Sequence, residues 1–254
     1  MHLDKRLQAV ASFVPQGAAF ADIGTDHAYL PVWLLEKGII ASAVAGDIAA
    51  GPCQAARTTV AMHGAVAAIS VRQGSGLAVL KPGEVDCIAI CGMGGSTISS
   101  ILAADMPIAL SVRRLILQPM AGAAALRRWL VNKGWHIIHE ELVEDEPHFY
   151  EIICAEREAG CAMPNSGAGD AACGPIEPAG YSEAEYLVGP ALLREGHALL
   201  AKQFARQEAS LQELLANMAR SERAKASAKY QETAQLAQAL AELKAKYKDK
   251  LVEV

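Results

Sequence analysis

Carboxylates and glycine gather in the stretch Phe20-Ala-Asp-Ile-Gly-Thr-Asp-His-Ala-Tyr-Leu-Pro31, where a short apolar strand leads into a turn. Open α/β sheets bind ligands at the carboxyl ends of their strands, so a strand that closes on Asp22 and Gly24 predicts a ligand site. The G-x-G-x-x-G spacing fails, because Gly24 is followed by Asp26 and Ala28. A carboxylate repels a pyrophosphate but suits the cationic groups of S-adenosylmethionine, so the turn favours this methyl donor over a dinucleotide.

Three further predicted strands end in turns that would complete one crevice. Residues 42–46 lead to Asp47, at a distance typical of an acidic residue that binds ribose hydroxyls. Dinucleotide sites share this feature, so Asp47 does not separate the two cofactors. The third and fourth strands, residues 68–72 and 85–90, lead into Gln73-Gly-Ser-Gly76 and Cys91-Gly-Met-Gly-Gly95.

Helical patterns separate the predicted strands, which is typical of a parallel sheet. Apolar spacing and glycine stops predict helices over residues 3–14, 27–37, 48–63, 95–104 and 121–133. A fifth strand at 112–117 is followed by two more, 135–142 and 149–155, with only a short acidic connection between them. Strands joined so briefly must pair antiparallel. Five β/α units followed by a hairpin predict an α/β fold of the class I methyltransferase type.

Four motifs taken together resemble the TrmK family, the bacterial tRNA adenine-N1 methyltransferases. They are Asp22-Ile-Gly-Thr-Asp-His-Ala-Tyr-Leu-Pro31, Val71-Arg-Gln-Gly74, Gly92-Met-Gly-Gly95 and Leu115-Ile-Leu-Gln-Pro119. The resemblance runs from about Leu3 to the C-terminal end and is closest up to about Glu156. It implies a Rossmann-like domain that uses S-adenosylmethionine, a helical C-terminal domain, and methylation of N1 of an adenine in the D-arm region of tRNA, namely adenine 22 in tRNA numbering.

The resemblance also implies roles for residues at the predicted strand ends. The expected cofactor-binding residues are Asp22, Gly24, Asp26, Asp47, Gln73, Gly74, Ser75, Cys91 and Gly92. The expected catalytic residues are Asp26, His27 and Tyr29. The expected substrate-binding residues are Tyr29, Met93, Gly94, Gln118 and Pro119. Within these sets, Asp47 is expected to accept hydrogen bonds from the donor ribose, and Tyr29 to stack on the target base.

Each of these residue types also has a structural alternative. Asp22 can cap the following helix, His27 and Tyr29 can pack at a helix start or in the core, and the glycines can serve close helix–strand packing. The family has an acidic residue at Ser75 and often asparagine at Met120, so those contacts are not carried over. The chain lacks the Asn/Asp-Pro-Pro-aromatic motif of many amino-methyltransferases, which favours a ring nitrogen as the target.

Composition divides the chain into three parts. We expect a catalytic domain at 1–158, a flexible Gly/Pro-rich linker at 159–180 and a helical antiparallel coiled-coil hairpin at 181–254. A break near Arg220-Ser-Glu-Arg223 would separate two apolar stripes, namely Leu192, Leu199, Leu200, Phe204, Leu211, Leu214 and Met218, then Leu236, Leu240, Leu243, Tyr247 and Leu251. The hairpin could pack only on itself, grip tRNA or form a dimer seam, so we expect a monomer or weak dimer.

The net charge of −5 does not favour nucleic-acid binding, which usually requires a basic surface. The charge is uneven: residues 1–180 carry 12 Lys and Arg against 18 Asp and Glu, whereas residues 181–254 carry 11 against 10. Local groups could grip phosphates or simply be solvated, namely His2, Lys5 and Arg6, then Arg113 and Arg114, then Arg127, Arg128 and Lys133. Two alternative functions remain open, a methyltransferase of the same fold acting on a small molecule or protein, and a donor-binding scaffold working through its helices.

The six cysteines form no C-x-x-C pair, so we expect buried, reduced thiols and no metal. They are Cys53, Cys87, Cys91, Cys154, Cys161 and Cys173. The sequence shows neither a long apolar run nor a secretory leader, so we expect a soluble cytoplasmic protein with no membrane contact.

Overall fold

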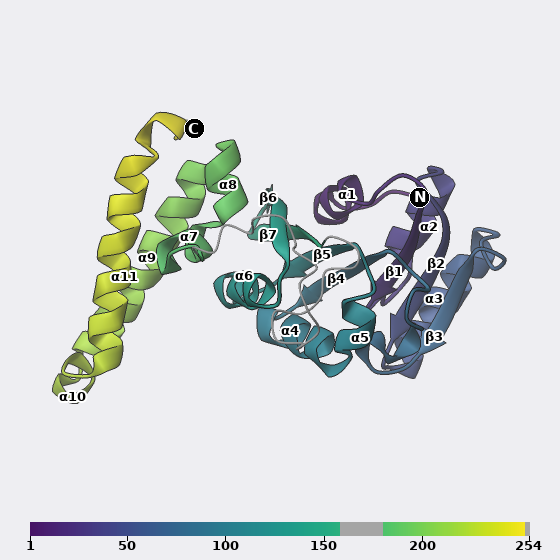
Figure 1. Ribbon diagram of the computed structural model, residues 1–254, viewed down its shortest axis with the longest axis horizontal. Coiled ribbons are helices and arrows are strands. Elements are labelled where there is room, and N and C mark those ends of the chain that lie inside the picture. The colour runs from purple at the N-terminus through teal and green to yellow at the C-terminus, as the bar shows by residue number, and fades with distance from the viewer. Residues whose placement is uncertain (158–179, 252–254) are drawn as a thin grey trace, which may run out of the picture. The chain divides into compact units, whose positions relative to one another are not determined.

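The computed structural model describes residues 1–157 and 180–251 (Figure 1). The chain divides into two compact units, Met1–Ile176 and Glu177–Val254. Almost all of the expected linker, together with Cys161 and Cys173, lies outside the described residues. No helix in the two described ranges combines the length and the apolar character that crossing a membrane requires.

The first unit is built on a seven-stranded sheet in the order β3-β2-β1-β4-β5-β7-β6. Strands β1 to β5 run parallel, whereas β7 is antiparallel to both β5 and β6. The predicted hairpin is therefore confirmed. The strands are β1 (Ala18–Ile23), β2 (Ile40–Asp47), β3 (Ile69–Gln73), β4 (Cys87–Met93), β5 (Arg114–Pro119), β6 (His136–Asp145) and β7 (His148–Glu156).

Helices precede and connect the strands, as the sequence pattern predicts. Among the described residues they are α1 (Lys5–Ser12), α2 (Tyr29–Glu36), α3 (Ala50–Met62), α4 (Gly95–Ala104), α5 (Met106–Ala109) and α6 (Ala123–Asn132), with the short 3-10 helix η1 (Gly76–Val79). Neither α5 nor η1 is anticipated by apolar spacing, because each is only one turn long. Helix α1 begins one residue after Asp4, whose carboxylate accepts a hydrogen bond from Leu7 N at 2.6 Å and so caps the helix.

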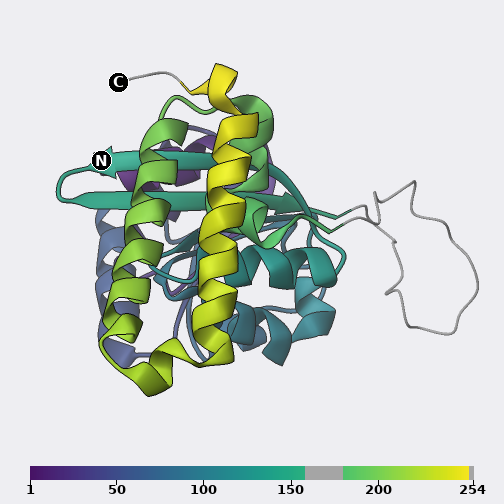
Figure 2. The same ribbon diagram turned by 90° about the vertical axis from the view of Figure 1, so that its left-hand side faces the viewer.

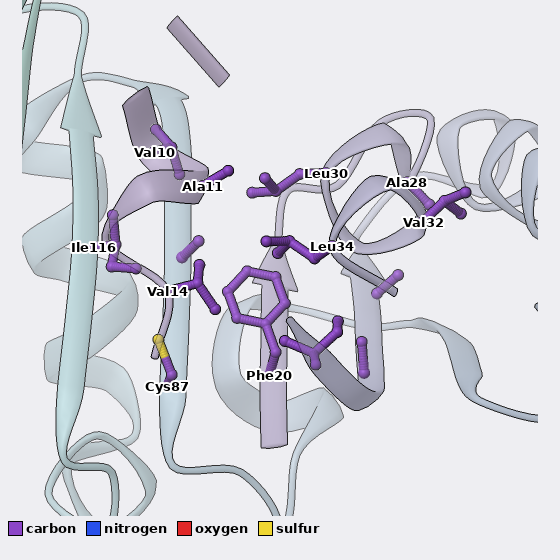
Figure 3. Packing of buried hydrophobic residues seen from close by; sticks show 14 of the residues in the cluster. Val10, Ala11, Val14, Phe20, Ala28, Leu30, Val32, Leu34, Cys87 and Ile116 are labelled. Carbon is purple, nitrogen blue, oxygen red and sulfur yellow. The ribbon is translucent and has the colours of Figure 1, made fainter. Parts of the chain in front are cut away.

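Alternation along the strands decides which side chains share a face of the sheet. Figure 3 shows Phe20 of β1 packed between Val14 and Leu34, with Cys87 and Ile116 in the same buried layer. Two residues beyond Phe20 and Ile116, the same face carries Asp22 and Gln118. The carboxyl ends of β1 and β5 therefore present polar side chains on the side of the sheet that α1 covers.

The second unit consists of helices over its described residues. They are α7 (Glu183–Val188), α8 (Pro190–Glu195), α9 (Leu200–Ala219), α10 (Glu222–Lys225) and α11 (Ala228–Lys246), followed by the 3-10 turn η2 (Lys248–Lys250). Helices α9 and α11 run side by side in opposite directions, with α10 between them at one end (Figure 2). The predicted break lies at this turn, whereas coiled-coil geometry stays a prediction.

Two features of this unit differ from the expectation. Leu214, expected on the packed stripe, is 42 % exposed. Ser182 and Glu185 form a capping box at the start of α7, a short helix that apolar spacing does not reveal.

Candidate active site

The turn after β1 contains an unusual alternation of left-handed residues. Gly24, Asp26 and Ala28 have φ angles of +79°, +47° and +56°. Only glycine adopts this conformation freely, so Asp26 and Ala28 each cost about 1 kcal/mol in backbone strain. Two hydrogen bonds anchor the turn, from Gly24 N and Thr25 N to the carbonyl of Gly46 at 2.8 and 3.1 Å. Strain held in place in this way is a common property of ligand-binding turns.

Asp22 lies beneath this turn and is only 6 % exposed. Its carboxylate accepts a hydrogen bond from Thr25 Oγ1 at 2.6 Å and does not cap α2, which starts after Ala28 without a side-chain cap. The helix-cap alternative for Asp22 is therefore wrong. Burial raises the pKa of Asp22 to about 6, with Asp47 adding to the rise, while Thr25 and the Arg6 cation act in the opposite direction.

Asp47 ends β2 and is half-buried, with one carboxylate oxygen accepting from Ala49 N at 2.8 Å. Its own carbonyl accepts from Gly74 N at 2.9 Å, which joins the ends of β2 and β3. A side chain at Gly74 would begin 2.7 Å from Val79 Cγ1, so close packing against Val79 favours glycine at this position. Ile48, which follows Asp47, is 69 % exposed. Sequence reasoning missed Ile48, although an apolar residue directly after an acidic strand end was a usable signal.

A cavity of about 350 Å³ opens beside Ser75, between η1 and α4. Its walls combine apolar side chains with hydroxyls and one carboxylate, and the lining residues are Ser75, Gly76, Leu77, Ala78, Thr97, Ser100, Ile101, Ala104 and Asp105. Gln73 is exposed at the end of β3, and its amide donates to the carbonyl of Ile48 at 3.3 Å. This side of the crevice therefore offers an apolar surface, neutral polar groups and the carboxylate of Asp105.

His27 and Tyr29 form an aromatic pair at the outer edge of the strained turn. Their rings are stacked, with centroids 5.1 Å apart and planes 10° from parallel. Tyr29 is 44 % exposed, so the alternative that it belongs to the core is wrong. Asp26 Oδ2 lies 3.6 Å from His27 Nε2, and the Asp26 side chain is 70 % exposed. The three expected catalytic residues thus lie together at the mouth.

The turn after β4 contains one glycine that close packing requires and one that it does not. A side chain at Gly95 would strike the carbonyl of Gly122, so close packing of α4 accounts for it. Gly92 instead forms a bulge between Cys91 and Met93 with φ +74°, and a side chain there would meet nothing closer than Arg6 Nη1 at 3.9 Å. Packing therefore does not explain Gly92. Met93 lies against Gly24, and this contact links the turn to the one after β1. Gly94 directly precedes α4.

Gln118 and Pro119 end β5 and are both buried. Gln118 Oε1 accepts hydrogen bonds from Gly92 N at 3.1 Å and Arg6 Nη1 at 2.9 Å. Cys91 lies opposite Gln118 in the sheet, and burial raises the pKa of its thiol, so we expect no thiolate there. The described residues contain no group of three or more side chains that could hold a metal ion.

Two of the arginines proposed to grip phosphates, Arg114 and Arg127, prove to be structural. Arg127 is fully buried and pairs with Glu140 at 2.5 Å and Glu151 at 2.7 Å, tying α6 to the β6–β7 hairpin. Arg114 donates to Glu156 at 2.7 Å and to the carbonyl of Phe13. A buried arginine needs carboxylate partners, and both guanidiniums are engaged by theirs. Neither is therefore presented to solvent, as a phosphate site requires.

The strand order, the strained acidic turn after β1 and the hairpin that closes the sheet define a class I methyltransferase. The family model described as a methyltransferase domain matches residues 3–153. A tRNA (adenine(22)-N(1))-methyltransferase of Bacillus subtilis is 40% identical over 207 residues, which cover 82% of each chain.

Solved structures give the same family. The Bacillus subtilis m1A22 tRNA methyltransferase TrmK superposes with a TM-score of 0.79 at 34% identity, over 95% of this chain and 98% of that one. Streptococcus pneumoniae Sp1610 in complex with S-adenosyl-L-methionine gives 0.77 at 34% identity, over 95% and 99%. The chain belongs to the TrmK family of tRNA adenine-N1 methyltransferases.

The buried carboxylate of Asp22 gives a prediction for stability. In the unfolded chain Asp22 ionises near its ordinary value of 3.8, whereas in the folded protein it ionises at about 6. As the pH rises between these values the unfolded state loses its proton first, so this group lowers stability progressively and does so fully above pH 6. Asp22→Asn is therefore expected to stabilise the protein at pH 8 by about 2–3 kcal/mol, a gain that shrinks towards pH 4.

Urea unfolding of both proteins at pH 4, 6 and 8 measures this difference. The exposed Asp86→Asn variant removes the same charge from a solvated position and should show no comparable gain at pH 8. If the wild type and Asp22→Asn keep a constant difference from pH 4 to pH 8, the buried carboxylate does not have the raised pKa.

Proposed function

We propose that the protein transfers the methyl group of S-adenosylmethionine to N1 of adenine 22 of tRNA, and that it acts in the cytoplasm. The observation that carries the proposal is the placement of the exposed Tyr29–His27 pair and Asp26 on the same turn that covers the buried Asp22. A donor site and a base-binding surface then share one crevice. The 40% identity to the Bacillus subtilis enzyme, over most of both chains, supports the choice of substrate.

The residues of the crevice fit S-adenosylmethionine. Asp22 offers a carboxylate for the donor's amino group, and Asp47 has an oxygen available for ribose hydroxyls besides the one that Ala49 N occupies. The cavity beside Ser75 and the exposed Ile48 offer an apolar surface for the donor's adenine. Ser75 is neutral where the family has an acidic residue, so we infer that backbone groups recognise the adenine edge.

The donor, when bound, supplies a methyl group on a positively charged sulfur. Adenine N1 already carries an in-plane lone pair, so the chain needs no strong base, and alignment and exclusion of water can provide most of the acceleration. Tyr29, with His27 behind it, would stack on the target base after that base leaves its helix. Methylation leaves a positive charge on the adenine. Asp26 would face this charge and accept a hydrogen bond from the exocyclic amine.

The first experiment is methyl transfer from labelled S-adenosylmethionine to unmodified tRNA transcripts, followed by nucleoside analysis. We expect 1-methyladenosine at adenine 22, and no label when that adenine is replaced by another base. Donor binding without label in any tRNA would overturn the proposal and direct the search to small-molecule or protein acceptors.

Asp47→Ala is expected to weaken donor binding about tenfold, because one charged hydrogen bond to the ribose is removed while the chemistry is not touched. Calorimetry measures the dissociation constant of the donor, and turnover at saturating donor should stay within about threefold of the wild type. Unchanged donor affinity in Asp47→Ala would remove Asp47 from the ribose site.

Asp26→Asn is expected to lower turnover by about 100-fold, because the neutral side chain no longer stabilises the charge that forms on the adenine. Asparagine tolerates the left-handed conformation at φ +47°, so the variant should not disturb the turn. Single-turnover kinetics at saturating donor and tRNA measure the effect. A variant with wild-type turnover would exclude Asp26 from the chemistry.

The turn between α9 and α11 carries an unusual density of positive charge for an acidic protein. Residues 220–229 contain four basic side chains and one acidic side chain. Arg220, Arg223, Lys225 and Lys229 are all exposed, and within residues 180–251 none of them has an ion-pair partner. We propose that residues 181–254 form the domain that contacts the tRNA backbone, with this turn as its phosphate-binding part.

Removing two of these charges, in the double variant Arg223→Gln and Lys225→Gln, is expected to weaken tRNA binding several-fold. The slope of log affinity against log salt should fall by about one for each phosphate that the variant no longer neutralises. The control double variant, Lys37→Gln with Arg57→Gln, removes equal charge from exposed positions in the first unit. Equal effects in the two double variants would show general charge attraction and no docking site.

A further inference from the structure

Arg6 reaches from the N-terminal helix to the buried end of β5. Its Nη1 donates to Gln118 Oε1 at 2.9 Å, its guanidinium carbon lies 5.7 Å from the ring centroid of Tyr150, and its side chain is 22 % exposed. Asp4, the capping residue of α1, lies 3.7 Å from Nη2 and adds a weak second contact. Arg6 is therefore held beside the carboxyl end of β5 by contacts with α1, β5 and β7.

The two donors on Gln118 Oε1 determine which way its amide points. Arg6 Nη1 and Gly92 N both donate to this oxygen, at 2.9 and 3.1 Å. Rotating the amide by 180° would place its NH₂ group against two N–H donors, which leaves all three without an acceptor. Gln118 therefore directs its NH₂ group away from Arg6, towards Met120.

The acceptor that Gln118 Nε2 finds inside the protein is weak. Its contact is the thioether sulfur of Met120 at 3.5 Å, although Gln118 itself is fully buried. A thioether is a poor acceptor, and a buried amide NH₂ ordinarily finds an oxygen. Met120, whose sulfur covers this NH₂ group, is itself 52 % exposed. An incoming acceptor atom would therefore reach this fixed donor by displacing the Met120 side chain.

The same hydrogen bonds hold the bulge at Gly92 in place. Gly92 is left out of the β4–β5 register, has φ +74° and has no side chain to anchor it. Its N–H bond to Gln118 Oε1 is a link between the bulge and β5 that does not belong to the strand ladder. Without Arg6, the Gln118 amide would keep only one donor on its oxygen and would be free to rotate. The bulge would then lose its partner in a fraction of the molecules.

We propose that Arg6 is a positioning residue which, through Gln118, fixes the Gly92 bulge and orients Gln118 Nε2 towards Met120, where a hydrogen-bond acceptor of the target nucleotide would reach it by displacing the Met120 side chain. The proposal rests on the proposed function, because it assigns the target nucleotide to this side of the crevice. It gives α1 a role in binding the nucleotide that is methylated, in addition to its packing in the core. Arg6 was expected only as one of several phosphate-gripping residues.

The test compares Arg6→Met, Gln118→Leu and the double variant with the wild type. Turnover is measured at saturating S-adenosylmethionine with tRNA, and donor affinity is measured by calorimetry. Each single variant should lower turnover 10- to 100-fold while donor affinity changes less than threefold. The turnover of the double variant should lie within threefold of that of Gln118→Leu, because Arg6 acts through Gln118. Arg57→Met, which removes an exposed cation from α3, should keep turnover within twofold of the wild type.

A second measurement does not depend on methyltransferase activity. In ¹⁵N spectra of the protein alone, Arg6→Met should shift or broaden the side-chain amide signals of Gln118 and the backbone signal of Gly92, while Arg57→Met leaves both unchanged. Arg6→Gln replaces Arg6→Met if the latter fails to fold.

Three results would overturn the proposal: losses that multiply in the double variant, donor affinity that falls as far as turnover, or unchanged Gln118 and Gly92 signals. A wild-type protein that methylates no tRNA would instead refute the proposed function, and the spectra would still decide whether Arg6 holds Gln118.

Discussion

The turn after β1 is the constraint on which the rest of the site depends. Two left-handed residues other than glycine, Asp26 and Ala28, are held there by the pairing of β1 with β2, whose Gly46 carbonyl takes both anchoring hydrogen bonds. This conformation delays the start of α2 until Tyr29, so the tyrosine stands at the first turn with its ring exposed. The same turn covers Asp22 and excludes water from it. One backbone arrangement therefore produces both a buried carboxylate and an open aromatic surface.

Several strands and helices could be predicted from the sequence because their signals are local. Apolar runs closed by glycine predict the parallel strands, and the short acidic connection requires the antiparallel hairpin. The start of α2 could not be predicted, since a left-handed alanine carries no sequence signal. Apolar spacing likewise misses η1 and α7, which are too short to show a period.

The candidate site was predictable where its residues follow strand ends, and unpredictable where contacts join distant parts of the chain. Asp22, Asp47 and Gln118 come from the carboxyl ends of strands, which a sequence read in βα units can locate. Arg6 and Gln118 are 112 residues apart, and nothing local in either segment indicates their contact. The opposite error affects Arg127, which looks like a surface cation in sequence but is neutralised by two buried carboxylates. In both cases the role of the arginine depends on contacts with residues that are distant in the sequence.

The raised pKa of Asp22 has a consequence for binding. A carboxyl that titrates at about 6 is largely a carboxylate at neutral pH and largely an acid one unit below that pKa. A proton and a cationic group placed beside Asp22 are then competing ligands for the same oxygen atoms. By linkage, a cation that binds there must release part of a proton, and the measured heat of binding will vary with the ionisation enthalpy of the buffer. The affinity of such a site for a cation therefore falls as the pH drops through the pKa of Asp22.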